Sequence, residues 1–298
     1  MPHRWPLTIA YTPDSDDAFY YDALETERVA FPAHRAVFRR EPMKVLNRAA
    51  LRGEYDVTAI SSVVYPQIAE RYAILSVGTS VGRGYGPVLV SKQEQTIDQL
   101  RGCRVGVPGI PTTGWFLLRC FCPEAVPVEM PFDQIAGAVA AGELDAGVMI
   151  HEELLYYTRM GLRCVMDLGA EWCRRHDLPL PVGLNVIHRD LGATAMEQIG
   201  ATIRRSLEYG LAHARETLSR VCRFGRGAEG QCTERFVAMF ANQDSVRMPA
   251  DVRAALRVLL CQVVDLGLAA NVPEIDIIEG SVATDTVATA TVRQSKAA

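Results

Sequence analysis

The feature that most constrains the fold of this chain is the alternation of short apolar runs with stretches of helical periodicity. Strands are expected at 7–11, 57–61, 74–77, 88–90, 104–107, 126–129, 146–150, 164–167 and 184–188. An amphipathic stretch at 18–27 and a helix at 44–52, closed by Gly53, lie between the first of these runs. Strands that alternate with helices predict α/β units rather than an all-α or an all-β fold.

The C-terminal third of the sequence has a different pattern. Long helices are expected at about 191–220, 230–243 and 249–268, followed by a strand at 275–278. A chain of 298 residues is near the size at which one hydrophobic core stops growing, so two lobes are expected.

A weak internal repeat supports two similar lobes. Residues 50–61 and 139–151 both contain a helix end, the sequence Gly-Glu-x-Asp, an apolar strand and a polar residue. One interpretation is a coincidence between two ordinary joins of helix, glycine and strand. The other is that Ser61 and Ser62 in one lobe and His151 in the other face a shared cleft, because ligands of open α/β sheets bind beyond the carboxyl ends of strands.

His151 is the most informative single residue. It follows a strand that has the composition of a buried one, and Glu152 and Glu153 come directly after it. A lone histidine is often structural. An imidazole titrates near neutral pH, however, and a nearby carboxylate can orient it and raise its basicity. The position therefore favours a general base.

Two turns between a strand and a helix carry polar residues. In Asp14-Ser15-Asp16-Asp17, Ser15 or Asp16 is a plausible N-cap, and the acidic run is either a helix cap or a hydrogen-bonding wall of a ligand cleft. In the turn at 108–114, Thr112 and Thr113 precede a helix that starts near Trp115. Backbone N–H groups at a helix start bind anions or carbonyl oxygens, so capping and ligand contact are compatible here.

Several classes of function are disfavoured. His151-Glu152-Glu153 is not a zinc motif, the acidic run lacks the glycine and distal glutamate of a calcium loop, and no nucleotide or serine-nucleophile motif is present. A net charge of −4 gives no footprint for nucleic acid or an anionic membrane. No apolar run approaches the roughly 18 residues that span a bilayer.

The cysteine pattern and the N-terminus predict a cytoplasmic protein. The eight cysteines match neither a metal site nor a disulfide framework, so reduced thiols in the core are expected. The N-terminus has no apolar signal segment.

Segments along almost the whole chain together resemble one known family. They are residues 12–19, 46–48, 56–61, 82–87, 107–113, 142–152, 167–172 and 178–183. In order and spacing they are similar to the 1,4-dihydroxy-6-naphthoate synthases of the futalosine route to menaquinone. The resemblance implies the two-lobed α/β fold of type 2 periplasmic binding proteins, with two crossover strands, used as a cytoplasmic enzyme.

The resemblance also implies a reaction and its residues. His151 matches the family's catalytic base, in an Ile-His-Glu motif. The substrate, cyclic dehypoxanthine futalosine, is cleaved without a metal or an organic cofactor. The family's ligand contacts match two short segments: Ala59, Ile60 and Ser61, and Thr113 and Gly114.

This sequence departs from the family pattern in the cleft. Ala59 stands where the family commonly has lysine, and Asp16-Asp17-Ala18-Phe19 stands where it has Asn-Asp-Thr-Phe. A lost cation and an added carboxylate would weaken binding of an anionic substrate. We expect the same activity, on a carboxylated small molecule, in a monomer or a homodimer.

The expected domain limits are 1–88 plus 187–298 for the first lobe and 89–186 for the second, with crossovers near 86–90 and 181–186. Two alternatives remain for the function. One is a solute-binding protein that captures a small carboxylated ligand, and the other is chorismate dehydratase, the sister activity of the same pathway.

Overall fold

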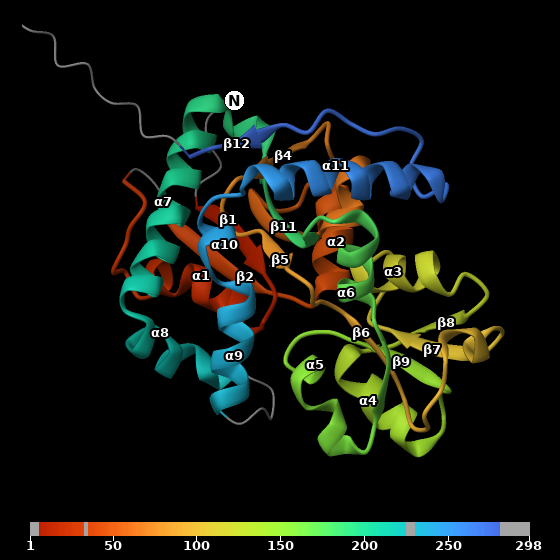
Figure 1. The fold of residues 1–298 in the computed structure, drawn as a ribbon. Helices are drawn as coiled ribbons and strands as arrows, with labels where there is room; N and C mark the ends of the chain where they lie inside the picture. Colours follow the sequence, from red (N-terminus) through yellow and green to blue (C-terminus); the bar gives the residue numbers. More distant parts are fainter. Residues whose placement is uncertain (1–5, 33–34, 225–229, 281–298) are drawn as a thin grey trace, which may run out of the picture.

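The computed structural model describes residues 6–32, 35–224 and 230–280, and it contains two sheets with helices packed around them (Figure 1). The seven-stranded sheet and its helices form the first lobe, and the five-stranded sheet and its helices form the second. In Figure 1 the second lobe lies below the first and to its right. The predicted two-lobed α/β fold is confirmed.

The first sheet has the strand order β12-β4-β11-β3-β1-β2, and β5 pairs with β11. Its strands are β1 (Leu7–Tyr11), β2 (Ala36–Arg40), β3 (Val57–Ser61), β4 (Tyr72–Leu75), β5 (Ser80–Gly82), β11 (Leu180–His188) and β12 (Ile277–Ile278). The long strand β11 runs antiparallel to β3, β4 and β5. It lies between β4 and β3 and therefore joins β12 and β4 to the parallel strands β3, β1 and β2.

The second sheet has the order β10-β6-β9-β7-β8. Its strands are β6 (Val88–Ser91), β7 (Arg104–Val107), β8 (Val126–Glu129), β9 (Ala146–Met149) and β10 (Arg163–Asp167). The chain therefore leaves the first sheet after β5 and returns to it with β11. The numerical limits of the two lobes remain a prediction.

The two lobes repeat one topology. In the first lobe, the strands β1, β2 and β3 are parallel and lie in the order β3-β1-β2. The helices α1 (Ser15–Glu25) and α2 (Met43–Arg52) connect them. In the second lobe, the strands β7, β8 and β9 are also parallel and lie in the order β9-β7-β8. The helices α3 (Thr113–Phe121) and α4 (Phe132–Ala141) connect them. An antiparallel strand, β11 or β6, then follows β3 or β9.

The sequence repeat lies at the same place in both lobes. Gly53 ends α2 and Gly142 ends α4, with φ angles of 70° and 80°. Both glycines adopt the left-handed conformation that closes helices, and glycine does so without a steric penalty. The strands that follow, β3 and β9, correspond to each other, and Ser61 ends the first while His151 lies in the turn just after the second.

The remaining helices cover the first lobe and its boundary with the second, except the short helix that follows β9 in the second lobe. They are α5 (Glu153–Tyr156), α6 (Leu168–His176), α7 (Ala193–Ala212), α8 (Ala214–Val221), α9 (Gly230–Phe240), α10 (Gln243–Val246) and α11 (Ala250–Asp265). The first helix, α1, packs against α7, α8 and α9 and is buried along most of its length. No helix in the ranges that the structure describes is both long and apolar enough to span a bilayer.

Most predicted elements are present, and the differences have local causes. The helix expected at 191–220 is divided at His213, and that expected at 230–243 ends at Phe240 before a capping box at Asn242 starts α10. The strand β2 was not predicted, because it is a half-exposed edge strand that ends in two arginines.

Candidate active site

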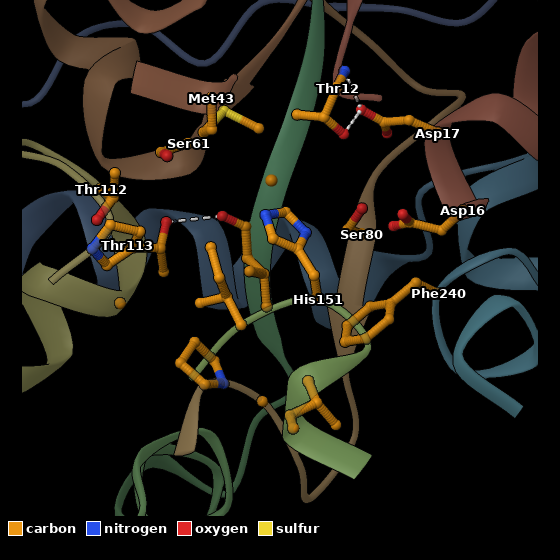
Figure 2. Close-up of a pocket in the computed structure, with 18 of the residues that line it drawn as sticks. Thr12, Asp16, Asp17, Met43, Ser61, Ser80, Thr112, Thr113, His151 and Phe240 are labelled. Atoms are coloured by element: carbon orange, nitrogen blue, oxygen red, sulfur yellow. Dashed lines mark hydrogen bonds between the residues drawn. The ribbon is translucent and has the colours of Figure 1, made fainter. Parts of the chain in front are cut away.

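A cavity lies between the two lobes, where the carboxyl ends of β1, β3, β7 and β9 meet. The space between its lining atoms is about 730 Å³, counted together with the open mouth. Its lining residues are Thr12, Asp16, Asp17, Met43, Ser61, Ser80, Gly86, Pro87, Pro108, Thr112, Thr113, Gly114, Ile150, His151, Leu154, Val182, Gly183, Phe236 and Phe240. Figure 2 shows the His151 ring between Thr113 on one side and Asp16 and Ser80 on the other.

His151 reaches the cavity from the turn after β9. Its Nδ1 lies 3.0 Å from Oδ2 of Asp14, and its side chain is 15% exposed, against 1% for Asp14. The Phe132 ring packs edge-on against the imidazole, with ring centroids 4.6 Å apart. Because Asp14 engages Nδ1, Nε2 is the ring nitrogen that can reach a bound molecule.

The surroundings of His151 favour its charged form. Burial disfavours the imidazolium, but the negative charge and hydrogen bond of Asp14, together with the charges of Glu153 and Glu152, outweigh burial and raise the pKa of His151 to about 9. The sequence favoured a general base, which acts in its neutral form. In this geometry the ring is charged at neutral pH, and the base form dominates only above about pH 9.

The carboxylate that orients His151 is not one of its sequence neighbours. Glu152 is fully buried and accepts a hydrogen bond from the Ser15 hydroxyl, while Glu153 lies in the first turn of α5. The orienting group is Asp14, on the opposite lobe. Sequence reasoning noticed Asp14 only as part of an acidic run, and a carboxylate directly after a strand was the signal that could have found it.

The acidic run forms a wall of the cavity. Asp14 is the N-cap residue of α1, but its side chain makes no capping hydrogen bond. Asp17 accepts hydrogen bonds from the Thr12 backbone N–H (2.9 Å) and hydroxyl (2.7 Å). Of the two sequence interpretations, the cleft wall describes this run better than side-chain capping.

Burial also raises the pKa values of the acidic side chains in this wall. Burial raises the pKa of Asp17 to about 6, although the hydrogen bonds from Thr12 lower it. Burial, together with the charges of Asp17 and Asp14, holds the pKa of Asp16 well above its ordinary value. A protonated Asp16 repels an anionic substrate less than the carboxylate expected from the sequence, and it can donate a hydrogen bond.

The N-terminus of α3 forms the opposite wall. Thr112 caps the helix by accepting a hydrogen bond from the Trp115 N–H (3.3 Å). The Thr113 hydroxyl donates to the Val182 carbonyl of β11 (2.6 Å). The Gly114 backbone packs closely, because an added Cβ would lie 3.0 Å from Val148 Cγ1. Thr113 and Gly114, both predicted as ligand contacts, line the cavity with the free N–H groups of a helix start.

Of the three contacts predicted on β3, only Ser61 lines the cavity. Asn47 of α2 holds it twice, since its Oδ1 accepts from the Ser61 N–H (2.9 Å) and its Nδ2 donates to the Ser61 hydroxyl (3.1 Å). Ala59 and Ile60 are buried in the strand and belong to the hydrophobic cores. The structure thus brings Ser61, Thr113, Gly114 and His151 together and leaves Ala59 and Ile60 behind the wall.

Sequence reasoning missed the apolar wall of the cavity. Phe236 and Phe240 come from α9, and Met43 comes from the start of α2. Phe236 and Phe240 are four residues apart on one helix, so they are neighbours on one face. The sequence does not show that this face lies against the second lobe, where α9 contacts α5.

All eight cysteines are unpaired. Only Cys122 is buried, whereas Cys164 and Cys261 are exposed, so the expected core location is wrong for most of them. In the part of the chain that the structure describes, no group of three or more histidine, cysteine, aspartate or glutamate side chains could hold a metal ion.

The arrangement of lobes is that of periplasmic binding proteins. The aliphatic sulphonate binding protein SsuA of Escherichia coli superimposes with a TM-score of 0.65 at 12% identity, covering 92% of this chain and 91% of that one. The alkanesulfonate-binding protein SsuA of Xanthomonas axonopodis gives a TM-score of 0.66 at 15% identity, covering 93% and 98%. These similarities define the class of fold.

Closer relatives define the family. The sequence profile described as "Menaquinone biosynthesis" matches residues 7–263. The 1,4-dihydroxy-6-naphthoate synthases of Thermus thermophilus and Streptomyces coelicolor are 36% and 32% identical, covering 90% and 88% of this chain and 97% and 94% of theirs. A crystal structure from Archaeoglobus fulgidus superimposes with a TM-score of 0.85 at 39% identity, covering 89% and 99%. The chain belongs to this family of menaquinone biosynthesis enzymes.

Proposed function

We propose that this chain is a carbon–carbon lyase that converts cyclic dehypoxanthine futalosine to 1,4-dihydroxy-6-naphthoate, with His151 as the general base. The observation that carries the proposal is the His151 imidazole, which lines the interlobe cavity and is held by the buried Asp14. An oriented imidazole is the group that acid–base chemistry at a carbon centre requires. The two named relatives support this choice of reaction.

The proposed roles of the other residues follow from what each one offers. The Ser61 hydroxyl and the N–H groups at Thr113 and Gly114 are donors that suit a substrate carboxylate. Phe240 and Met43 offer an apolar surface for an aromatic ring. Asp16, in its protonated form, donates a hydrogen bond to a polar part of the substrate.

The reaction starts when the neutral form of His151 takes a proton from the bound substrate through Nε2, and carbon–carbon cleavage follows. The lobes exclude water while this happens, which strengthens each electrostatic interaction in the cavity. We propose that no metal or organic cofactor takes part and that the enzyme works in the cytoplasm as a monomer or homodimer. The lobes proposed for it are 1–88 plus 187–298 and 89–186.

The decisive experiment is incubation of the purified chain with cyclic dehypoxanthine futalosine, followed by mass spectrometry. The proposal expects 1,4-dihydroxy-6-naphthoate to accumulate with the wild type and not with His151→Asn. Tight binding without conversion in the wild type would identify a solute-binding protein instead. Dehydration of chorismate, tested in parallel, would identify the sister activity.

A further inference from the structure

We propose that Asp14 is the positioning residue of His151 and acts from the opposite lobe, so that closing the two lobes assembles the catalytic base. The inference rests on the proposed function for the role of His151. The contact itself is independent of any reaction, because it joins the turn after β9 to the turn before α1.

The first support is the geometry of the pair. Oδ2 of Asp14 lies 3.0 Å from Nδ1, and the carboxylate is almost completely buried. A carboxylate on Nδ1 keeps the proton on that nitrogen, which leaves the lone pair of the neutral ring on Nε2. The ring therefore has one orientation, in which the basic Nε2 faces the bound substrate.

The second support is what Asp14 does not do. It stands at the N-cap of α1 with an extended backbone, where an aspartate side chain ordinarily accepts a hydrogen bond from the first turn. In this chain it makes no such bond. The Asp14 carboxylate contacts His151 instead of capping the helix. This is expected if Asp14 serves the site and not the stability of α1.

The third support comes from the backbone of His151. Its φ is +55°, in the left-handed region that residues other than glycine seldom adopt. Such strained conformations gather at functional sites and persist where the surroundings hold them. The strained turn places the ring against Phe132 and within reach of Asp14.

A second contact beside the first shows that the pair belongs to a larger junction. The Ser15 hydroxyl donates to Oε1 of Glu152, and both residues are fully buried. Each contact joins the N-terminal end of α1, where Asp14 is the N-cap and Ser15 the first helical residue, to the turn after β9. Separating the lobes along this edge would break both contacts together, so His151 would lose its partner whenever the cleft opened.

The opposite edge of the cleft is joined as well. Asn47 Nδ2 donates to the Pro111 carbonyl (2.9 Å), and Lys44 pairs with Glu129. The described structure is therefore the closed arrangement, with contacts between the lobes on both sides of the cavity. The titratable groups that face His151 in this state are Asp14, Asp16, Asp17, Glu152 and Glu153.

The test compares Asp14→Asn and Asp14→Ala with Asp133→Asn, which removes an exposed acid from the first turn of α4 and leaves the cleft intact. The His151 ring is followed by NMR in protein with ¹⁵N-labelled histidine, with His151→Asn for assignment. We expect the pKa near 9 to fall by at least one unit in Asp14→Ala. In Asp14→Asn it falls as well, while the amide oxygen still accepts the Nδ1 proton. The control leaves it unchanged.

Turnover gives the second readout. At a pH where His151 is neutral in every variant, kcat of Asp14→Ala falls roughly tenfold to 100-fold, KM changes by less than about threefold, and Asp14→Asn lies between the two proteins. Loss of a merely structural residue would not separate kcat from KM in this way. An unchanged kcat in both variants would overturn the proposal.

A third readout tests the link to closure. The double variant Asp14→Ala and Ser15→Ala should have a larger radius of gyration in small-angle X-ray scattering than the wild type. A double variant as compact as the wild type, with the pKa of its imidazole unmoved, would overturn the inference. If the wild type fails to convert cyclic dehypoxanthine futalosine, the proposed function fails, whereas the NMR and scattering results still decide the role of Asp14.

Discussion

Nδ1 of His151 in the second lobe and Oδ2 of Asp14 in the first lie 3.0 Å apart. They follow different strands of the repeated topology, because Asp14 comes after β1, the counterpart of β7, whereas His151 comes after β9, the counterpart of β3. This contact orients the ring, and the charge and hydrogen bond of Asp14, together with the charges of Glu153 and Glu152, outweigh the burial that would otherwise favour the neutral form and raise the pKa of His151.

The pH dependence of catalysis follows from this charge. A general base acts in its neutral form, so kcat/KM should rise with pH and level off above about pH 9. At pH 7 only roughly one molecule in 100 has the neutral ring. The measurement is kcat/KM from pH 6 to 10. An activity that falls over this range would instead make the imidazolium a general acid.

Replacement of the imidazole itself should abolish most of the turnover. Asparagine is the best substitute for His151, because it tolerates the positive φ and keeps hydrogen-bonding groups without a proton acceptor at neutral pH. We expect kcat of His151→Asn to fall by ~100-fold or more, with a much smaller change in affinity. Product formation and calorimetric binding are measured side by side, with the exposed His213→Asn as control. Near wild-type turnover would remove His151 from its role.

Loss of the Ser61 hydroxyl should affect binding more than chemistry. Ser61 faces the cavity and is held by Asn47. Removing one hydrogen bond costs about 1 kcal/mol, so Ser61→Ala should raise KM about fivefold and leave kcat within about twofold. Ser62→Ala is the matched control, because Ser62 is buried next to it and does not line the cavity. Equal effects of the two variants would contradict the assignment.

The junction between the lobes has almost no room at Gly169. A Cβ at this position would lie 2.4 Å from the Gly86 Cα and 2.5 Å from its N, so backbone must move. Gly169→Ala should therefore lower the free energy of unfolding by about 2 kcal/mol or more in urea denaturation. Gly137→Ala in α4, where a Cβ meets nothing within 4 Å, should leave stability the same or raise it. A similar result for both would show that the contact yields easily.

The thiols should all titrate, but at different rates. The eight cysteines are unpaired, and Cys164 and Cys261 are the exposed ones. With a thiol reagent under native, non-reducing conditions, these two should react first and the buried Cys122 last. Denaturation should then release all eight groups. A total below eight in denaturant would reveal a disulfide.

Sequence periodicity predicted the strands that carry the site, because each is a buried apolar run with a glycine or a polar turn at its end. The strands β1, β3, β7 and β8 have the limits expected from the pattern. The repeat around Gly53 and Gly142 also reflects a true equivalence, since both glycines end helices that lead into corresponding strands.

The partner of His151 could not be predicted in the same way. Glu152 and Glu153 are adjacent in sequence and offered a local explanation, whereas Asp14 approaches only once the lobes are placed together. That Ala59 and Ile60 do not line the cavity has a related reason. Successive side chains of a strand point to opposite faces of the sheet, and every residue of β3 is buried. Of the three predicted contacts, only Ser61, at the end of the strand, lines the cavity.

The repeated strand order of the lobes has a practical meaning for protein engineering. Every polar residue proposed to meet the substrate lies at the carboxyl end of β1, β3, β7 or β9 or in the turn and helix start that follow it, while the strands themselves fill the hydrophobic cores. Different stretches of the chain thus determine substrate recognition and the stability of the fold. Exchanging these four segments, each from a strand end into the following turn and helix start, as a set between relatives should transfer the choice of substrate and leave the scaffold as it is.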